Sequence, residues 1–148
     1  MNLKIVLLML VVVVIQSSVV SAITDSDKTT VEMATDKTLS SNPNILYASA
    51  SFGPDDSLDV TLVPMYSTQL SIALSISTTL VVYAGTLLMY PDIGRLDLTM
   101  AKEDKTTVCT MYCLPEWAKS MRLSLDGGFD SGDLVKLAEQ VAKTMSVP

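Results

Sequence analysis

The pattern of hydrophobic and polar positions has a period of two over much of the chain. In a strand, successive side chains point to opposite faces of the sheet, so this alternation predicts half-buried β-strands. Segments rich in Gly, Pro, Asp or Lys separate the alternating runs, which favours antiparallel connections between neighbours. The alternating strands predicted in this way are residues 58–64, 95–101 and 117–125, and residues 45–52 and 106–113 are predicted as strands beside them.

The middle of the chain carries no charged residue from position 60 to position 91. Such a segment can cross a membrane, but apolar and small residues alternate at 70–77, which again predicts a strand. Residues 80–90 are apolar on both faces, as in a central strand covered on both sides. We therefore expect two core strands here, and a membrane span through residues 60–91 is the alternative.

A helical period replaces the alternation near the C-terminus. Asp130 or Ser131 can cap the first turn of a helix there. The positions that follow form one continuous apolar stripe: Leu134, Leu137, Ala138, Val141 and Met145. The whole pattern predicts an α+β fold, namely an antiparallel meander sheet of six to seven strands, possibly a half-barrel, with one C-terminal amphipathic helix packed on it.

The N-terminus has the layout of a secretory signal peptide. Lys4 precedes an unbroken apolar run at residues 5–15, and Val20-Ser21-Ala22 ends the segment with small residues. The apolar run is shorter than the roughly 20 residues that a spanning helix needs. We therefore expect residues 1–22 to be cleaved and the mature protein to be secreted, into the extracellular space or the periplasm.

Two units follow the signal peptide. Residues 23–44 are acidic and rich in Ser and Thr, with few large apolar side chains, so we expect a flexible leader. Residues 45–148 are expected to form a single α+β domain, a size that suits one hydrophobic core.

Charge and composition narrow the function. The chain has 10 Lys+Arg against 16 Asp+Glu and no His. An acidic protein repels phosphate backbones, so a nucleic-acid partner is not expected. Without His, the commonest general base and the usual Ser and Cys nucleophile arrangements are absent, and we expect no enzymatic activity and no cofactor.

The two cysteines of the chain are Cys109 and Cys113. An even cysteine count in a secreted chain favours a disulfide bond. Residues four apart in an extended strand are about 13 Å apart, which is too far for a bond. The prediction is therefore a bond that closes a small loop at 110–112, with a bond to another chain as the alternative.

The strongest metal candidate in the sequence is the segment 126–133. Asp126, Asp130 and Asp133 supply carboxylates among glycines, a composition that could surround Ca²⁺. The EF-hand spacing is absent, and a strand-to-helix turn with its cap explains the same residues. Calcium is thus a weak candidate, and the sequence assigns no catalytic or ligand-binding residue.

Together these features predict a small secreted, non-enzymatic protein that acts by binding. The partner would be another protein or a small apolar ligand held between sheet and helix. Two other hypotheses stay open: a membrane protein that spans through residues 60–91, and a small secreted toxin or effector.

Overall fold

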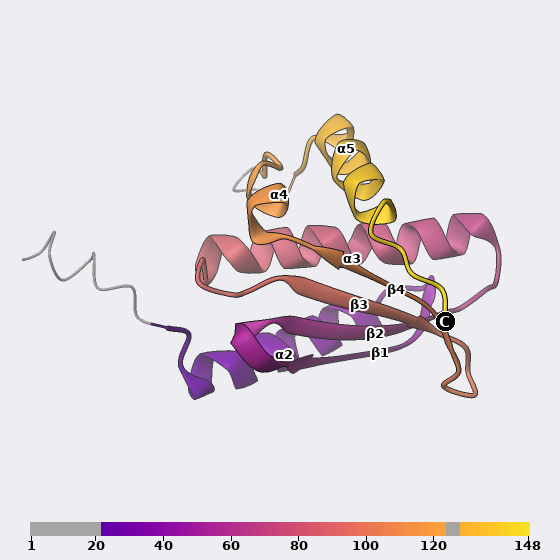
Figure 1. The fold of residues 1–148 in the computed structure, drawn as a ribbon, viewed down its shortest axis with the longest axis horizontal. Coiled ribbons are helices and arrows are strands. Elements are labelled where there is room, and N and C mark those ends of the chain that lie inside the picture. Colours follow the sequence, from indigo (N-terminus) through magenta and orange to yellow (C-terminus); the bar gives the residue numbers. More distant parts are fainter. Residues whose placement is uncertain (1–21, 124–127) are drawn as a thin grey trace, which may run out of the picture.

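The computed structural model describes residues 22–123 and 128–148, so the predicted signal peptide lies outside the described residues except for Ala22. The described residues form an α+β fold around one four-stranded sheet with the strand order β1-β2-β3-β4 (Figure 1). The strands are β1 (Ile45–Phe52), β2 (Leu58–Pro64), β3 (Leu96–Ala101) and β4 (Thr107–Cys113). The helices are α2 (Asp25–Ser40), the short 3-10 turn η1 (Pro54–Asp56), α3 (Gln69–Met89), α4 (Pro115–Lys119) and α5 (Ser131–Ala142).

The sheet is mixed, which corrects the predicted antiparallel meander of six to seven strands. β1 and β2 form an antiparallel pair, as do β3 and β4, but β2 and β3 run parallel. A parallel pair needs a long crossover, and α3 supplies it between the end of β2 and the start of β3. The bounds predicted for β1 to β4 lie within one residue of the observed ends.

The two strands predicted at 70–77 and 80–90 are wrong, because one uninterrupted helix, α3, occupies both. The alternation of Leu and Ile with Ser at the start of α3 is not its buried pattern. Ser71, Ser75 and Thr79, spaced as i, i+4 and i+8, are buried instead. The C-terminal half of α3 then contributes Leu80, Tyr83 and Leu87 to the core under the sheet.

Side-chain hydrogen bonds explain how α3 tolerates a buried row of hydroxyls. The Ser75 hydroxyl bonds the carbonyl of Ser71 at 2.8 Å and lies 3.1 Å from the carbonyl of Asn44. The Thr79 hydroxyl donates to the carbonyl of Ser75 at 2.9 Å. A hydroxyl that bonds the carbonyl four residues earlier is satisfied within the helix, so its burial carries no unpaired polar group.

The predicted flexible leader at residues 23–44 contains a regular helix, α2. Thr24 caps it, because its hydroxyl oxygen accepts from the backbone N–H of Asp27 at 3.1 Å. Val31, Thr35 and Leu39 are buried at a spacing of one per turn. This stripe is too narrow to stand out in the sequence, but it is enough to hold α2 along β1, as Figure 1 shows.

The C-terminal part corrects one prediction and confirms another. Residues predicted as a strand at 117–125 begin instead within α4, while residues 124 and 125 lie outside the described residues. The predicted C-terminal helix is present as α5, and Leu137 and Val141 are its buried residues. It packs on α3 and on β4, so it is one of several helices and not the single one that was predicted (Figure 1).

Candidate functional site

The four-stranded sheet has one face in the core and one face turned away from it. On β2 and β3, the inward residues such as Val60 and Leu98 are 1 % exposed and belong to the core. The outward residues alternate with them and are polar or half-buried, for example Thr61 and Thr99. Helices α3, α4 and α5 lie on the core side in Figure 1, so the other face is the uncovered face of the sheet.

Strand register arranges the uncovered face into three rows across the sheet. The acidic row is Ser51, Asp59, Asp97 and Tyr112, and the hydroxyl row is Ser49, Thr61, Thr99 and Thr110. The third row, called apolar for Val63 and Ala101, joins the pair Tyr47–Val63 to the pair Ala101–Thr107, and all four residues line one depression. Val63 and Ala101 are each 6 % exposed, yet they lie outside the main core cluster. The face therefore changes from acidic to apolar along the strands, with a neutral hydroxyl row between.

Two adjoining depressions lie over this face. One, of about 790 Å³, is lined at the acidic row by Asp55, Asp59, Asp97 and Arg95. The other, of about 660 Å³, is lined at the apolar row by Tyr47, Val63 and Ala101. Thr61 and Thr99 line both depressions, so the hydroxyl row is their common floor.

Short-range contacts hold the two carboxylates of the acidic row. The Arg95 guanidinium donates to the Asp97 carboxylate at 2.9 Å, and this bond raises the pKa of Arg95. The Ser57 hydroxyl donates to the Asp59 carboxylate at 3.1 Å. Asp59 and Asp97 are direct cross-strand neighbours, a position at which like charges repel each other. A cationic group bound between them would relieve that repulsion.

An aromatic stack stands at the end of the acidic row. The guanidinium carbon of Arg95 lies 5.3 Å from the centre of the Tyr112 ring, within cation–π range. The Tyr112 ring stacks in turn on Trp117 of α4, with 6.0 Å between ring centres. This stack fixes Arg95 over β4 and leaves the carboxylate of Asp59 without a basic partner among the described ion pairs.

The predicted disulfide bond is not formed. Cys109 and Cys113 are both free and buried. β4 runs through both positions without the turn that an intramolecular bond needs, since Cys109 pairs with Met100 and Cys113 with Leu96. Burial raises the pKa of both thiols, to about 12 for Cys113. The two side chains act as small apolar residues of the core.

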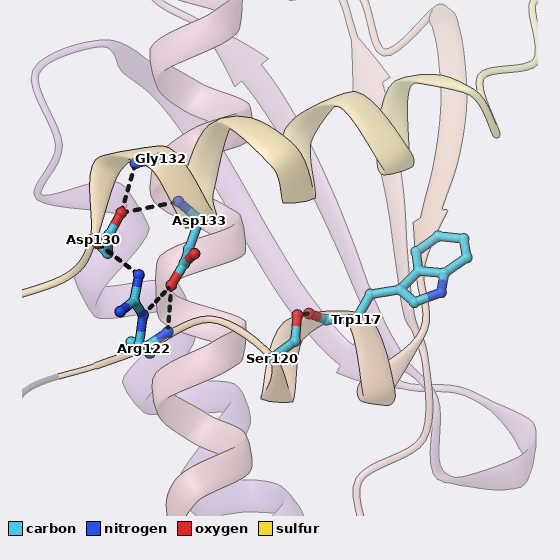
Figure 2. A network of polar contacts seen from close by, with 6 residues as sticks. All are labelled: Trp117, Ser120, Arg122, Asp130, Gly132 and Asp133. Carbon is cyan, nitrogen blue, oxygen red and sulfur yellow. Dashed lines mark hydrogen bonds and ion pairs between the residues drawn. The ribbon is translucent and has the colours of Figure 1, made fainter.

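The structure gives Asp130 and Asp133, two of the three calcium candidates, other partners. Figure 2 shows the Arg122 guanidinium between them, at 2.9 Å from each carboxylate. Asp130 also caps α5, because it accepts from the backbone N–H groups of Gly132 and Asp133. The third candidate, Asp126, lies outside the described residues.

A metal ion would compete with Arg122 for those carboxylates, whose charge the guanidinium already balances. The Arg122 contact lowers the pKa of Asp133. Within residues 22–123 and 128–148, no group of three or more Cys, Asp or Glu side chains is arranged to hold a metal ion. Trp117 points away from this cluster in Figure 2, toward the opposite end of α4.

Sequence reasoning missed the uncovered face because its rows depend on strand register. Asp59, Asp97 and Tyr112 lie in three different predicted strands, 58–64, 95–101 and 106–113, and nothing in the sequence placed them beside one another. A register that places Asp59 beside Asp97 follows from the parallel pairing of β2 with β3. The signal available in the sequence was the repeated Asp-x-Thr of residues 59–61 and 97–99.

Comparisons with known proteins give no assignment: no family model, no curated protein and no solved structure matches this chain. α3 is long and apolar enough, by length and composition, to cross a membrane. In the most apolar 18-residue stretch of α3, a third of the residues are buried inside the fold, where they pack against the core.

Proposed function

We propose that this protein is a secreted, non-enzymatic binding domain that binds a partner protein through the uncovered face of its sheet. The observation that carries the proposal is the continuous surface of acidic, hydroxyl and apolar rows, with two adjoining depressions over it. A surface that is shallow, wide and graded in polarity suits a protein segment better than a compact small molecule.

Packing between sheet and helix favours the protein partner over the small apolar ligand. The space between the sheet and α3 is occupied by side chains that are almost completely buried: Leu58, Leu62, Leu80, Leu96 and Leu98 are each at most 1 % exposed. A ligand held there would have to displace this core.

The charges of the site favour a partner with a basic side chain. Asp55, Asp59 and Asp97 face the depression over the acidic row, against the single cation Arg95. The apolar row lies four residues farther along the strands, from Asp59 to Val63, which is about 13 Å. An extended segment with a basic residue at one position and an apolar residue four positions away matches both ends.

The chemistry of the uncovered face supports binding without catalysis. Its Ser and Thr hydroxyls have no His to activate them, because the chain contains none. Its two facing carboxylates are held by Arg95 and Ser57, which suits charged anchors for a ligand.

The position of α2 supports secretion. Cleavage after Ala22 would leave Thr24, the capping residue, and the whole of α2 in the mature chain. The predicted cleavage site thus falls just before α2, which is the first helix among the described residues.

The test uses isotope-labelled mature protein and a synthetic probe peptide, Gly-Lys-Gly-Thr-Gly-Phe-Gly, in which Lys and Phe are four positions apart. We expect the peptide to shift backbone amide resonances of β2 and β3 near the three rows. The control peptide has Glu in place of Lys and should bind at least about tenfold more weakly, or about 1.4 kcal/mol.

Variants of the protein then show which residues contribute to binding of the Lys peptide. The Asp59→Asn/Asp97→Asn double variant should bind the Lys peptide more weakly and the Glu peptide more tightly, so that the difference between the two peptides shrinks. Glu139→Gln on the exposed surface of α5 removes a charge away from the face and should change neither. Equal binding of both peptides, or shifts confined to the α2 or α5 surface, would contradict the proposal.

The exposure of α3 favours the membrane hypothesis as a second candidate function. Carbonate extraction of cells that express the full chain separates the two. Release of the protein into the soluble fraction supports the secreted binding domain, and carbonate-resistant pelleting of the processed chain supports a membrane protein.

A further inference from the structure

Helix α3 exposes large apolar side chains near both of its ends. Leu70 is 70 % exposed, Leu88 is 69 % exposed and Leu74 is 40 % exposed. Large apolar side chains that line up on one exposed helix face are an informative departure from ordinary surface composition. The buried row of Ser71, Ser75 and Thr79 makes the departure stronger, since the inner side is here more polar than the outer side.

The exposed leucines fall on one line along the helix, together with two half-buried residues between them. Leu70, Leu74, Ser77, Val81 and Leu88 follow steps of four, three, four and seven residues, which is the spacing of a two-helix contact. We call these five residues the α3 seam. Ser77 and Val81 are half-buried at its centre, and the leucines stand at its two ends.

The absence of charge along the α3 seam lets a second copy of this acidic chain approach it, and we take that copy as its partner. The chain has a formal net charge of −6, so two copies repel each other over most of their surfaces. The seam lies within residues 60–91, where no charge occurs. Two seams can therefore approach without like-charge contacts.

The composition of α3 does not suit a helix that lies on the surface of a lipid bilayer. A helix that lies on a membrane carries Lys or Arg along its polar side, and no basic residue occurs from 60 to 91.

We propose that two copies of this protein associate through the α3 seam, with the two helices antiparallel about a two-fold axis. An antiparallel pair places Leu70 of each copy near Leu88 of the other, so each exposed end covers the opposite one. It also sets the two helix dipoles against each other favourably. The interface is one helix wide, so we expect micromolar affinity.

Sedimentation of the mature protein over a concentration series tests the proposal. The wild-type chain should convert from monomer to dimer in the micromolar range. Leu74→Glu and Leu70→Glu should each raise the dimer dissociation constant by about tenfold or more, because each would bury a charged carboxylate against apolar side chains of the other copy. Circular dichroism checks that both variants keep the helix content of the wild type.

Matched controls place Glu at exposed apolar positions on other helices. Val135→Glu on α5 and Met33→Glu on α2, at 56 % and 63 % exposed, should leave the dissociation constant unchanged. A wild-type chain that stays monomeric throughout the series would overturn the proposal. So would control variants that weaken the dimer as much as the seam variants, or a wild-type monomer that instead sediments with neutral phosphatidylcholine vesicles.

This proposal is independent of peptide binding on the sheet. The Asp59→Asn/Asp97→Asn variant should form the dimer as the wild type does, and Leu74→Glu should bind the Lys peptide as the wild type does. Either proposal can therefore fail while the other stands.

Discussion

The carboxylate of Glu32 on α2 accepts a hydrogen bond of 2.8 Å from the backbone N–H of Phe52 on β1. Asp36, one helical turn later, accepts in the same way from the N–H of Ala50. A helix advances about 6 Å over four residues and a strand about 6.7 Å over two, so the two spacings match. α2 thus closes the free edge of β1 with side chains, where another strand would use its backbone.

The opposite edge of the sheet is closed by the C-terminal segment. Thr110 of β4 exchanges two backbone hydrogen bonds of 2.9 Å with Ser146, and the N–H of Tyr112 donates to the Thr144 hydroxyl at 2.9 Å. Unpaired edge groups invite association with other chains. With both edges occupied, the uncovered face and the α3 seam are the surfaces left for partners in the proposals above.

Removal of the edge carboxylates should destabilise the fold. Glu32→Ala leaves the N–H of Phe52 without its acceptor, so we expect the free energy of unfolding to fall by about 1–3 kcal/mol. Glu32→Gln keeps an acceptor oxygen and should cost less than half as much. Urea unfolding of the two variants measures the difference. Equal losses for Ala and Gln would show that the hydrogen bond does not stabilise β1.

The inverted packing of α3 predicts an unusual pair of substitutions. Ser75→Leu adds an apolar side chain to a fully buried site beside Asn44, and we expect it to cost about 1–3 kcal/mol through overpacking. Leu74→Ser removes a half-exposed leucine one position earlier and should cost less than about 1 kcal/mol in dilute, monomeric protein. Thermal unfolding ranks them. The opposite order would mean that the leucines face the core.

That inversion also explains which parts of the fold the sequence could predict. β2, β3 and most of β4 alternate in burial, so their bounds were accessible, whereas β1 has an irregular register near Ile45 and buries only Ile45 and Ala48. In α3, Leu70, Ile72, Leu74 and Ile76 also alternate in the sequence. This alternation does not reflect a strand, because the segment is a helix that buries residues with hydroxyl groups. Period-two counting weighs only apolar residues, and the buried helical row of Ser71, Ser75 and Thr79 contains none.

The candidate site was beyond sequence reasoning for a different reason. Each of its residues sits at an ordinary outward position of a strand. The rows appear only when the parallel pairing sets Asp59 beside Asp97 and Thr61 beside Thr99. That pairing depends on α3 being a crossover helix, so the wrong assignment of α3 also hid the site.

Two glycines should respond to alanine in opposite directions. An added Cβ at Gly85 of α3 meets nothing within 4 Å, and Ala favours a helix, so Gly85→Ala should stabilise the monomer by about 0.5–1 kcal/mol. At Gly94 the Cβ would lie 2.6 Å from the backbone carbonyl oxygen of Asp55, so Gly94→Ala should destabilise it. The carbonyl of Gly94 also accepts a hydrogen bond of 2.6 Å from the Tyr83 hydroxyl, which holds the segment around Gly94 on α3. Urea unfolding compares the two variants, and the same sign for both would contradict the packing described.

The buried thiol of Cys113 should make the fold weaken at alkaline pH. Burial raises the pKa of this thiol in the folded state to about 12, against 9.0 for the exposed group. Above pH 9 the unfolded chain has lost the proton that the folded chain keeps, so stability falls as the pH rises toward 12. Between about pH 8 and pH 10 the loss of unfolding free energy from this thiol is about 1.4 kcal/mol.

The Cys113→Ala variant lacks the titrating group. Between pH 8 and pH 10 its unfolding free energy should therefore fall by about 1.4 kcal/mol less than that of the wild type, even though the variant is less stable throughout. Urea unfolding under reducing conditions measures both slopes. Parallel slopes for the wild type and the variant would mean that the Cys113 thiol ionises in the folded protein as it does in water.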